Sequence, residues 1–231
     1  MKPNPFIWSS IGMLSLAAGL AAPAAHAADV STGTGLYLGG SISFNHVSDL
    51  GAKIDSSLAS QGYNSSTSAD SWSTNPSLRL GYQFNPNFAL EGTYDRVGNM
   101  GLESSLSSPA DMASGDWKSW GLGLHALGIV PIDSKWSVYG RLGVEQWHTS
   151  LGLTSNTGGP TSLSNSDDTT SLALGAGVSY ALTPNIDATA ELIHYTRVGD
   201  ADSTGRSGLN EVSLGLRYHF TQVPAPAGFR L

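Results

Sequence analysis

From Leu36 onward, apolar and polar residues alternate along the chain, and this period-two pattern restricts the fold more than any other feature. In VSLGLRYHF (212–220), for example, Ser, Gly, Arg or His separates each aliphatic or aromatic residue from the next. A period of two is that of a β-strand with one apolar and one polar face. The pattern recurs in about eight runs, an even number that suits a closed antiparallel barrel.

The connectors between these runs are alternately short and long. The short ones are rich in Pro, Asn and Asp, which favour tight turns, and they cover residues 85–87, 131–135 and 183–185. The long ones are rich in Ser, Gly, Asn, Thr and Asp, and we expect loops over roughly residues 47–71, 97–117, 149–169 and 197–210. Short turns at one rim and long polar loops at the other are typical of bacterial outer-membrane barrels. The sequence therefore predicts an all-β fold, an eight-stranded antiparallel up-and-down transmembrane β-barrel spanning roughly residues 34–220, with periplasmic turns and extracellular loops.

A soluble barrel would alternate equally well with its faces reversed, and the aromatic residues favour the membrane. They gather at both ends of the apolar face: Tyr82, Phe84, Phe88, Trp136, Tyr180, Tyr218 and Phe220 near the short turns, and Tyr94 and Trp120 toward the long loops. Two aromatic belts around an aliphatic band match the two interfaces of a bilayer. The opposite face carries Gly, Ser and charges of both signs, which suit a narrow lumen.

The N-terminal segment predicts export. Lys2 precedes a long apolar run that ends in Ala25-His26-Ala27, the small-x-small pattern of a signal-peptidase site. We therefore expect residues 1–27 to be a cleaved signal peptide, 28–220 the barrel and 221–231 a short periplasmic tail containing Pro and Ala. The expected location is the cell outer membrane.

Composition and motifs argue against several other classes of function. The formal net charge of -7 disfavours nucleic-acid binding, which needs a basic face. There is no cysteine, and no zinc-ligand spacing, nucleotide loop or nucleophile elbow occurs. The sequence thus predicts no cofactor, no metal and no catalytic residue.

Charged residues on the polar faces of the strands are the candidate functional residues. Counting from the short turns places Arg79 opposite Glu91 and His125 near Arg141. The complete inward set is Arg79, Glu91, His125, Arg141, Glu145, Glu191 and Arg217. Unpaired charges in a narrow bore are costly, so we expect these residues to form ion pairs. The alternative is that they gate a small ion path.

Several stretches resemble the transmembrane domain of the OmpA family: GYQFNPNFALEGTYDRVGNM (81–100), PIDSKWSVYGRLGVEQW (131–147), YALTPNIDATAEL (180–192) and VSLGLRYHF (212–220). The resemblance implies eight strands, periplasmic termini and four surface loops. In full-length family members, a Pro/Ala-rich linker leads to a peptidoglycan-binding domain. VPAPA (223–227) is similar to the start of that linker, but only four residues follow it, so no peptidoglycan-binding domain is expected.

The resemblance extends only in part to the lumen gate known in the family, which uses two acids, an arginine and a lysine. Glu91 matches one of the acids. The other three matching positions hold Thr189, Leu127 and Ser179. The gate as the family builds it is therefore not expected here, although Arg79 is a candidate replacement partner for Glu91.

The predicted function is a structural and surface-contact role exercised through the four loops. The alternative is a narrow, low-conductance pore. A remote alternative is lipid A modification. Some outer-membrane barrels that deacylate lipid A use a His and a Ser two residues apart, with an acid that orients the His. His148-Thr149-Ser150 has this spacing. Asp167 and Asp168 are expected in a loop. The expected partners are outer-membrane lipids, lipopolysaccharide and the assembly machinery, which would read a final strand ending in Tyr218 and Phe220; we expect a monomer.

Overall fold

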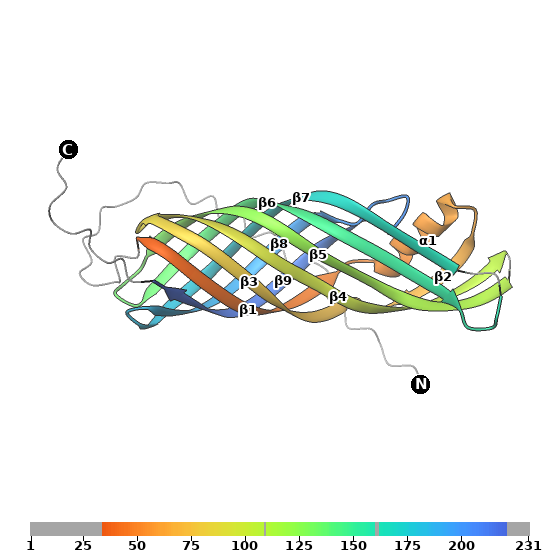
Figure 1. The fold of residues 1–231 in the computed structure, drawn as a ribbon, viewed down its shortest axis with the longest axis horizontal. Helices are drawn as coiled ribbons and strands as arrows, with labels where there is room; N and C mark the ends of the chain where they lie inside the picture. Colours follow the sequence, from red (N-terminus) through yellow and green to blue (C-terminus); the bar gives the residue numbers. More distant parts are fainter. Residues whose placement is uncertain (1–33, 109, 160–161, 221–231) are drawn as a thin grey trace, which may run out of the picture.

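The computed structural model describes residues 34–108, 110–159 and 162–220 (Figure 1). The predicted signal peptide and the predicted periplasmic tail lie outside these residues. The described part of the chain forms nine strands and one helix: β1 (Gly35–Val47), α1 (Leu50–Ser60), β2 (Asn64–Ala69), β3 (Trp72–Asn85), β4 (Phe88–Ser108), β5 (Ala110–Pro131), β6 (Trp136–Ser155), β7 (Ser162–Thr183), β8 (Ile186–Val198) and β9 (Ser207–His219).

Eight of the nine strands close into an antiparallel barrel, as the alternation predicts. Each pairs with its neighbours in the chain, and β1 closes the ring by pairing with both β3 and β9. The short strand β2 pairs with the outer part of β4, beyond its pairing with β3. Figure 1 shows α1 and β2 at one end of the barrel and the start of β1 at the other. In the described ranges, no helix has the length and apolar character needed to cross a membrane.

The aliphatic band and the aromatic belts lie on the outside of the barrel, as predicted. Leu124 and Leu142, in the middle of their strands, are 54% and 53% exposed to the surroundings. At the short-turn end, Trp136 packs against Tyr180 with ring centroids 4.7 Å apart. At the other end of the band, Tyr94 lies 6.4 Å from Trp120. An apolar surface of this kind is stable against lipid, and the closed ring bonds every strand to two neighbours.

The predicted loops at 97–117 and 149–169 are wrong, because most of these residues continue the strands. The hairpin of β4 and β5 reaches Ser108 and Ala110, and that of β6 and β7 reaches Ser155 and Ser162. The fourth predicted loop shortens to residues 199–206. The barrel wall therefore continues well past the outer aromatic belt. We call this part the extracellular extension, and its described residues are 97–108, 110–117, 149–159 and 162–169.

The polarity of the two faces inverts where the extracellular extension begins. On β6, the outward Leu142 and Val144 give way to the outward His148, Ser150 and Thr154. The inward positions change in the opposite sense, from charged residues to Leu151 and Leu153, which are 1% exposed. Water replaces lipid outside the extension, so polar side chains face outward and apolar ones are buried within. On β4 the inversion coincides with a bulge between Val97 and Met100, where Asn99 has a φ of 35°.

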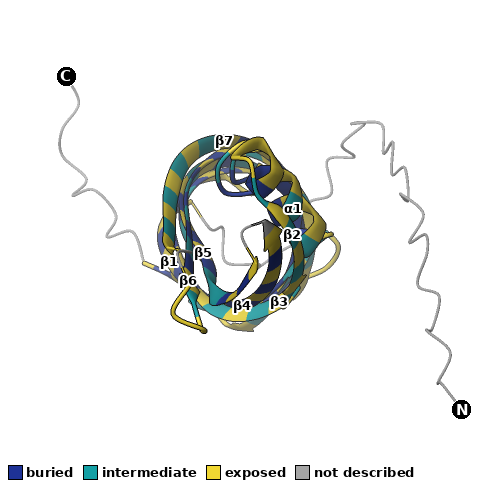
Figure 2. Cartoon of the chain, turned by 90° about the vertical axis from the view of Figure 1, so that its right-hand side faces the viewer, coloured by how far each residue is buried: buried dark blue, intermediate teal, exposed yellow. Residues whose placement is uncertain are grey.

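The first predicted loop, 47–71, contains α1 and β2. Leu50, Ile54 and Leu58 recur every fourth residue, which places them on one face of a helix. This face is buried in the mouth of the barrel (Figure 2). We call the resulting core the apolar plug, and its members are Val47, Leu50, Ile54, Leu58, Val97, Met100, Leu102, Leu106, Ala113, Trp117, Trp147, Leu151, Leu153, Ala173, Ile193, Tyr195, Val198 and Leu209.

The short turn between β5 and β6 lies where the sequence predicted it, and it is held by an aspartate side chain. Asp133 Oδ1 accepts hydrogen bonds from the backbone N–H groups of Lys135, at 2.7 Å, and Trp136, at 2.8 Å. These two hydrogen bonds stabilise the carboxylate and lower the pKa of Asp133. The turn thereby starts β6 with Trp136 on the lipid-facing side.

Candidate functional site: the lumen and the outer rim

The lumen of the membrane-spanning part is filled by charged and aromatic side chains. All seven residues assigned to it from the sequence lie on the inner wall and are buried: Arg79, Glu91, His125, Arg141, Glu145, Glu191 and Arg217. They come from six strands, because each is an inward position of its own strand. The alternation alone therefore places these side chains in one narrow space.

Arg141 is the centre of this arrangement. Its Nη2 donates to Glu91 Oε1 at 2.6 Å and to Glu191 Oε1 at 2.8 Å, and neither Arg141 nor Glu91 has an exposed side-chain surface. Arg79 pairs with Glu191 and lies 3.4 Å from Glu211. Each arginine thus bridges acids from different strands, and together they link opposite sides of the barrel. We call Arg79, Glu91, Arg141, Glu191, Glu211 and Arg217 the lumen network.

Arg79 and Glu91 lie close together. The prediction that they are directly opposite each other on neighbouring strands is wrong. Arg79 Nη1 lies 3.6 Å from Glu91 Oε1. In the strand register, Arg79 is opposite Thr93, and Glu91 is opposite Gly81. Asn85 itself pairs with Phe88, so the turn residues are Pro86 and Asn87, and an irregularity between Gln83 and Asn85 moves the register by one residue. Counting from the turn, which gave Glu91, therefore missed the true partner of Arg79 by two residues. Long side chains still reach across this diagonal.

His125 was expected near Arg141, and the strand register makes Arg141 its diagonal neighbour, with Gly143 directly opposite His125. The hydrogen-bond partners of the imidazole are other residues. The imidazole Nε2 is 2.9 Å from Glu145 Oε2, and Thr93 Oγ1 also donates to that oxygen at 2.9 Å. The position opposite His125 is a glycine whose added Cβ would lie 2.6 Å from the ring, so its small size makes room for the imidazole.

The sequence analysis missed four lumen residues. Two are tyrosines: Tyr37 donates to Glu91 Oε2 at 2.8 Å, and Tyr139 and Tyr37 flank the Arg217 guanidinium at 5.5 and 4.7 Å from their ring centroids. The other two are the acids Asp95 and Glu211, which are 1% exposed. The available signal was the alternation within each strand: Tyr139, Asp95 and Glu211 lie an even number of positions from a predicted residue of the same strand, and Tyr37 lies on the polar face of β1.

The lumen is closed at two successive levels. The lumen network crosses the membrane-spanning part, and Asp95, Glu145 and Glu211 lie toward its outer side. Beyond them the apolar plug begins with Trp147 and Tyr195, whose rings meet edge to face at 5.2 Å. Trp117 Nε1 donates to the Thr204 carbonyl at 3.1 Å, which ties the 199–206 segment to the plug. An eight-stranded barrel has room for little besides such side chains.

At the outer rim, the structure changes the environment expected for His148. Asp168 is not in a loop but on β7, directly opposite His148. Its Oδ1 lies 2.9 Å from His148 Nδ1, and the imidazole also packs against Trp120 at 5.6 Å. Ser150 occupies the next outward position of β6. The described residues include a carboxylate–imidazole pair with a nearby serine, but no hydrogen bond joins His148 to Ser150.

Metal binding and the final strand are the remaining predicted features. Within residues 34–108, 110–159 and 162–220, no group of three or more His, Asp or Glu side chains is arranged to hold a metal ion. Tyr218 and Phe220, predicted as an assembly signal, face outward with their rings 5.2 Å apart and nearly perpendicular. Their position is at the short-turn end of the closing strand.

A closed antiparallel barrel with an outward apolar band between two aromatic belts is an integral outer-membrane protein. The OmpA-like transmembrane domain family matches residues 32–223, and the chain belongs to this family. Outer membrane protein A of Shigella flexneri is 33% identical over 155 residues, which are 64% of this chain and 42% of that protein. The Klebsiella pneumoniae protein of the same name is 33% identical over 147 residues, 63% of this chain and 40% of that protein. The chain thus matches about two fifths of the length of these relatives.

Two solved structures have the same fold. The outer membrane protein OprG of Pseudomonas aeruginosa is 15% identical, has a TM-score of 0.55 and covers 84% of this chain and 100% of its own. Neisserial surface protein A is 18% identical, has a TM-score of 0.50 and covers 81% of this chain and 98% of its own. At this level of identity, the similarity concerns the barrel fold alone.

Proposed function

We propose that this protein is a closed structural barrel of the outer membrane, and that its extracellular extension makes contacts at the cell surface. The observation that carries the proposal is the inversion of polarity along the strands. It gives a lipid-bound base filled by the lumen network and a water-exposed outer part filled by the apolar plug. Strands, helix and segment 199–206 hold that outer part in one shape, which suits contact with other molecules.

The same observation opposes the alternative of a narrow ion pore. An ion would have to pass both the buried arginine–glutamate pairs and the buried side chains of α1. The test is planar-bilayer recording with purified protein, compared with a variant lacking residues 50–60. We expect no reproducible unitary currents from the intact protein. Stable unitary conductance of the intact protein would refute a closed barrel and favour the pore.

Lipid A modification remains a second candidate, because the His148–Asp168 hydrogen bond supplies one requirement for activating a serine. A positioned base must also reach the nucleophile, and His148 and Ser150 make no hydrogen bond to each other. We therefore expect purified protein to leave lipid A intact in detergent or liposomes, as measured by mass spectrometry. Loss of an acyl chain with wild-type protein but not with Ser150→Ala would establish an enzyme.

The partners that we propose follow from the surface of the barrel. Outer-membrane lipids and lipopolysaccharide would cover the aliphatic band and its belts. The assembly machinery would bind the closing strand that ends in Tyr218 and Phe220. We propose that the protein acts as a monomer, since the ring of strands leaves no unpaired edge in the membrane-spanning part.

A further inference from the structure

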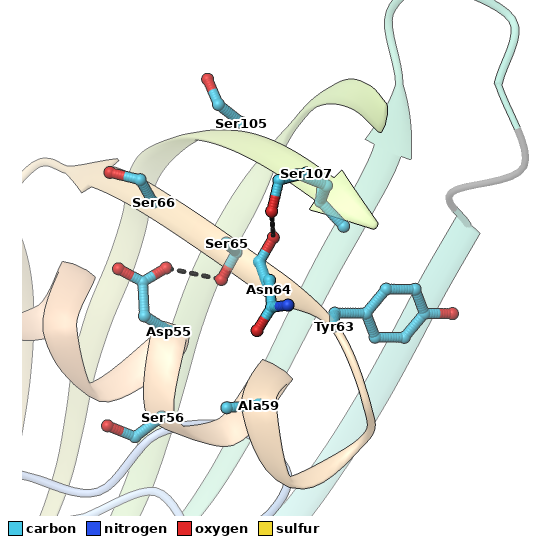
Figure 3. A pocket seen from close by; sticks show the side chains of 10 residues that line it. Asp55, Ser56, Ala59, Tyr63, Asn64, Ser65, Ser66, Ser105 and Ser107 are labelled. Atoms are coloured by element: carbon cyan, nitrogen blue, oxygen red, sulfur yellow. Dashed lines mark hydrogen bonds between the residues drawn. The ribbon is translucent and has the colours of Figure 1, made fainter. Parts of the chain in front are cut away.

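A cavity lies at the extracellular end of the barrel, where α1, β2 and β4 meet (Figure 3). Its volume is about 590 Å³, within the usual range for ligand sites of small molecules. Five serines line it, together with Asp55, Asn64 and Tyr63, while Ala59 and Leu106 supply apolar surface. None of the lumen network belongs to this lining. The cavity is thus a separate site on the part of the protein that faces the medium.

The walls of the cavity are held together by Asp55 of α1. Its Oδ1 accepts hydrogen bonds from the hydroxyls of Ser65 and Thr67, both at 2.7 Å, and its Oδ2 accepts the backbone N–H of Thr67 at 3.1 Å. On the opposite wall, the Ser107 hydroxyl donates to the Asn64 carbonyl at 3.3 Å. These bonds join the helix to β2 and β2 to β4. A ligand would therefore meet a preformed site, which lowers the entropic cost of binding.

Two hydroxyls at the cavity are available to a ligand. Ser66 of β2 and Ser105 of β4 are direct cross-strand neighbours, and both side chains face outward and are exposed. Among the described residues, no side chain pairs with either hydroxyl. Each can donate one hydrogen bond and accept two, so the pair offers both functions side by side. Tyr63 adds an aromatic ring at the end of α1, where it packs partly against the apolar plug.

The charge of the lining restricts the class of ligand. Its described residues include no Lys, Arg or His, and their one carboxylate, that of Asp55, repels anions. Phosphorylated, sulfated and sialylated ligands are therefore disfavoured. The lining pairs hydroxyl, amide and carboxylate groups with small apolar surfaces and a ring. This combination suits a ligand with many hydroxyls and exposed C–H groups but no charge.

We propose that this cavity binds a neutral oligosaccharide. The proposal rests on the proposed surface-contact role and names the chemistry of one contact. The same sugars occur in two sources, the lipopolysaccharide of the surrounding outer leaflet and glycans that come from outside the cell. Both would reach the cavity from the outward face of β2 and β4.

The test uses the full chain, refolded in detergent and labelled with a fluorophore, on an array of neutral oligosaccharides. These are built from glucose, galactose, mannose and N-acetylglucosamine, and sulfated and sialylated oligosaccharides of the same length serve as comparison. Ser66→Leu places a larger apolar side chain in the cavity. Ser164→Leu is the matched control, since Ser164 is an exposed serine on the outward face of β7, outside the cavity. Retained heat-modifiable migration shows that both variants fold.

We expect binding to a subset of the neutral sugars, weakened about tenfold or more by Ser66→Leu, the equivalent of one or two lost hydrogen bonds. Ser164→Leu should change the affinity less than about twofold. Preference for the sulfated or sialylated sugars, equal binding by Ser66→Leu, or no binding to any neutral sugar would overturn the proposal. A second arm adds purified lipopolysaccharide as a competitor, and its displacement of a bound neutral sugar from the wild type identifies the cell's own outer leaflet as the source; a bound sugar that lipopolysaccharide does not displace identifies glycans from outside the cell.

A separate readout keeps this inference distinct from the surface-contact role. Cells that display the protein are tested for attachment to host cells and to plastic, beside cells that display a variant with residues 50–69 replaced by a short linker. If attachment depends on the protein while Ser66→Leu binds the neutral sugars as well as the wild type does, the surface role stands and the sugar site falls. If no attachment depends on the protein while Ser66→Leu still abolishes sugar binding, the site stands without that role.

Discussion

The barrel should be strongly destabilised when the lumen network loses a single partner, and Arg141 is the most informative residue to change. Arg141→Met keeps much of the side-chain volume but removes the shortest ion-pair partner of Glu91 and one of the two arginine partners of Glu191. Both acids are almost completely buried, so water cannot replace the lost hydrogen bonds. Breaking a buried pair by removing one partner typically costs about 3–5 kcal/mol. We expect a loss of that size.

The assay is urea unfolding in liposomes, followed by tryptophan fluorescence. With a denaturant slope of about 2 kcal/mol/M, a loss of about 4 kcal/mol lowers the unfolding midpoint by about 2 M urea. Lys118→Met is the matched control, because Lys118 pairs with Asp116 at 3.3 Å but the two side chains are 58% and 46% exposed. An exposed pair contributes about 0–1 kcal/mol, so this midpoint should hardly change.

The double variant Arg141→Met/Glu91→Gln separates pairing from packing. Removing a charge of each sign leaves Glu191 with Arg79 as its partner, so the combined loss should be smaller than the sum of the single losses. Coupling between contacting residues is typically about 0.5–3 kcal/mol, and we expect the upper part of that range here. The reasoning fails if the two losses add, or if Arg141→Met costs no more than Lys118→Met.

Three further predictions concern the rest of the barrel. Leu142→Arg, on the lipid face of β6, should cost about 2–4 kcal/mol in the same unfolding assay. Thr154→Arg, on the outward face of the same strand within the extension, should cost almost nothing. Equal costs would contradict the boundary between the membrane-spanning part and the extension. Ile54→Ala should destabilise the apolar plug by about 2–5 kcal/mol and speed amide exchange in α1 without affecting the middle of β4, and the exposed Lys53→Ala should not. Gly177→Val should impair refolding, since its Cβ would lie 2.6 Å from the Tyr139 ring, and a normal yield of heat-modifiable protein would show that the lumen can rearrange.

The sequence predicted the lipid-bound part of the barrel because one physical rule governs every strand there. Lipid outside and a narrow lumen inside impose strict alternation, so Leu142 and Arg141 could each be assigned a face. The register between neighbouring strands was harder to predict from the sequence. Asn85 pairs with Phe88, and the register changes by one residue between Gln83 and Asn85, but no residue type there indicates either feature. The residue expected directly opposite Arg79 was therefore two residues away from the true one, although Arg79 and Glu91 were both placed on the correct face.

The extracellular extension was missed for a different reason. Its outward residues are mostly Ser, Gly, Asp and other polar residues, which also occur in loops. The alternation of Leu151 and Leu153 was still present, as was the four-residue spacing of Leu50, Ile54 and Leu58. Both patterns read correctly only if an apolar face can point into the barrel, which the rule for the membrane part excludes.

The inversion of polarity also fixes how far the protein stands above the membrane. β6 has 20 residues. At about 3.3 Å per residue and a tilt of about 45°, such a strand rises roughly 45 Å, of which the apolar band takes up about 25 Å. The remaining height of roughly 20 Å belongs to the extracellular extension, which acts as a rigid pedestal and holds the outer rim above the headgroup layer. Molecules approaching from the medium can therefore reach the rim before they reach lipid, and substitutions on the pedestal's outward face can alter what is recognised without disturbing the anchor below.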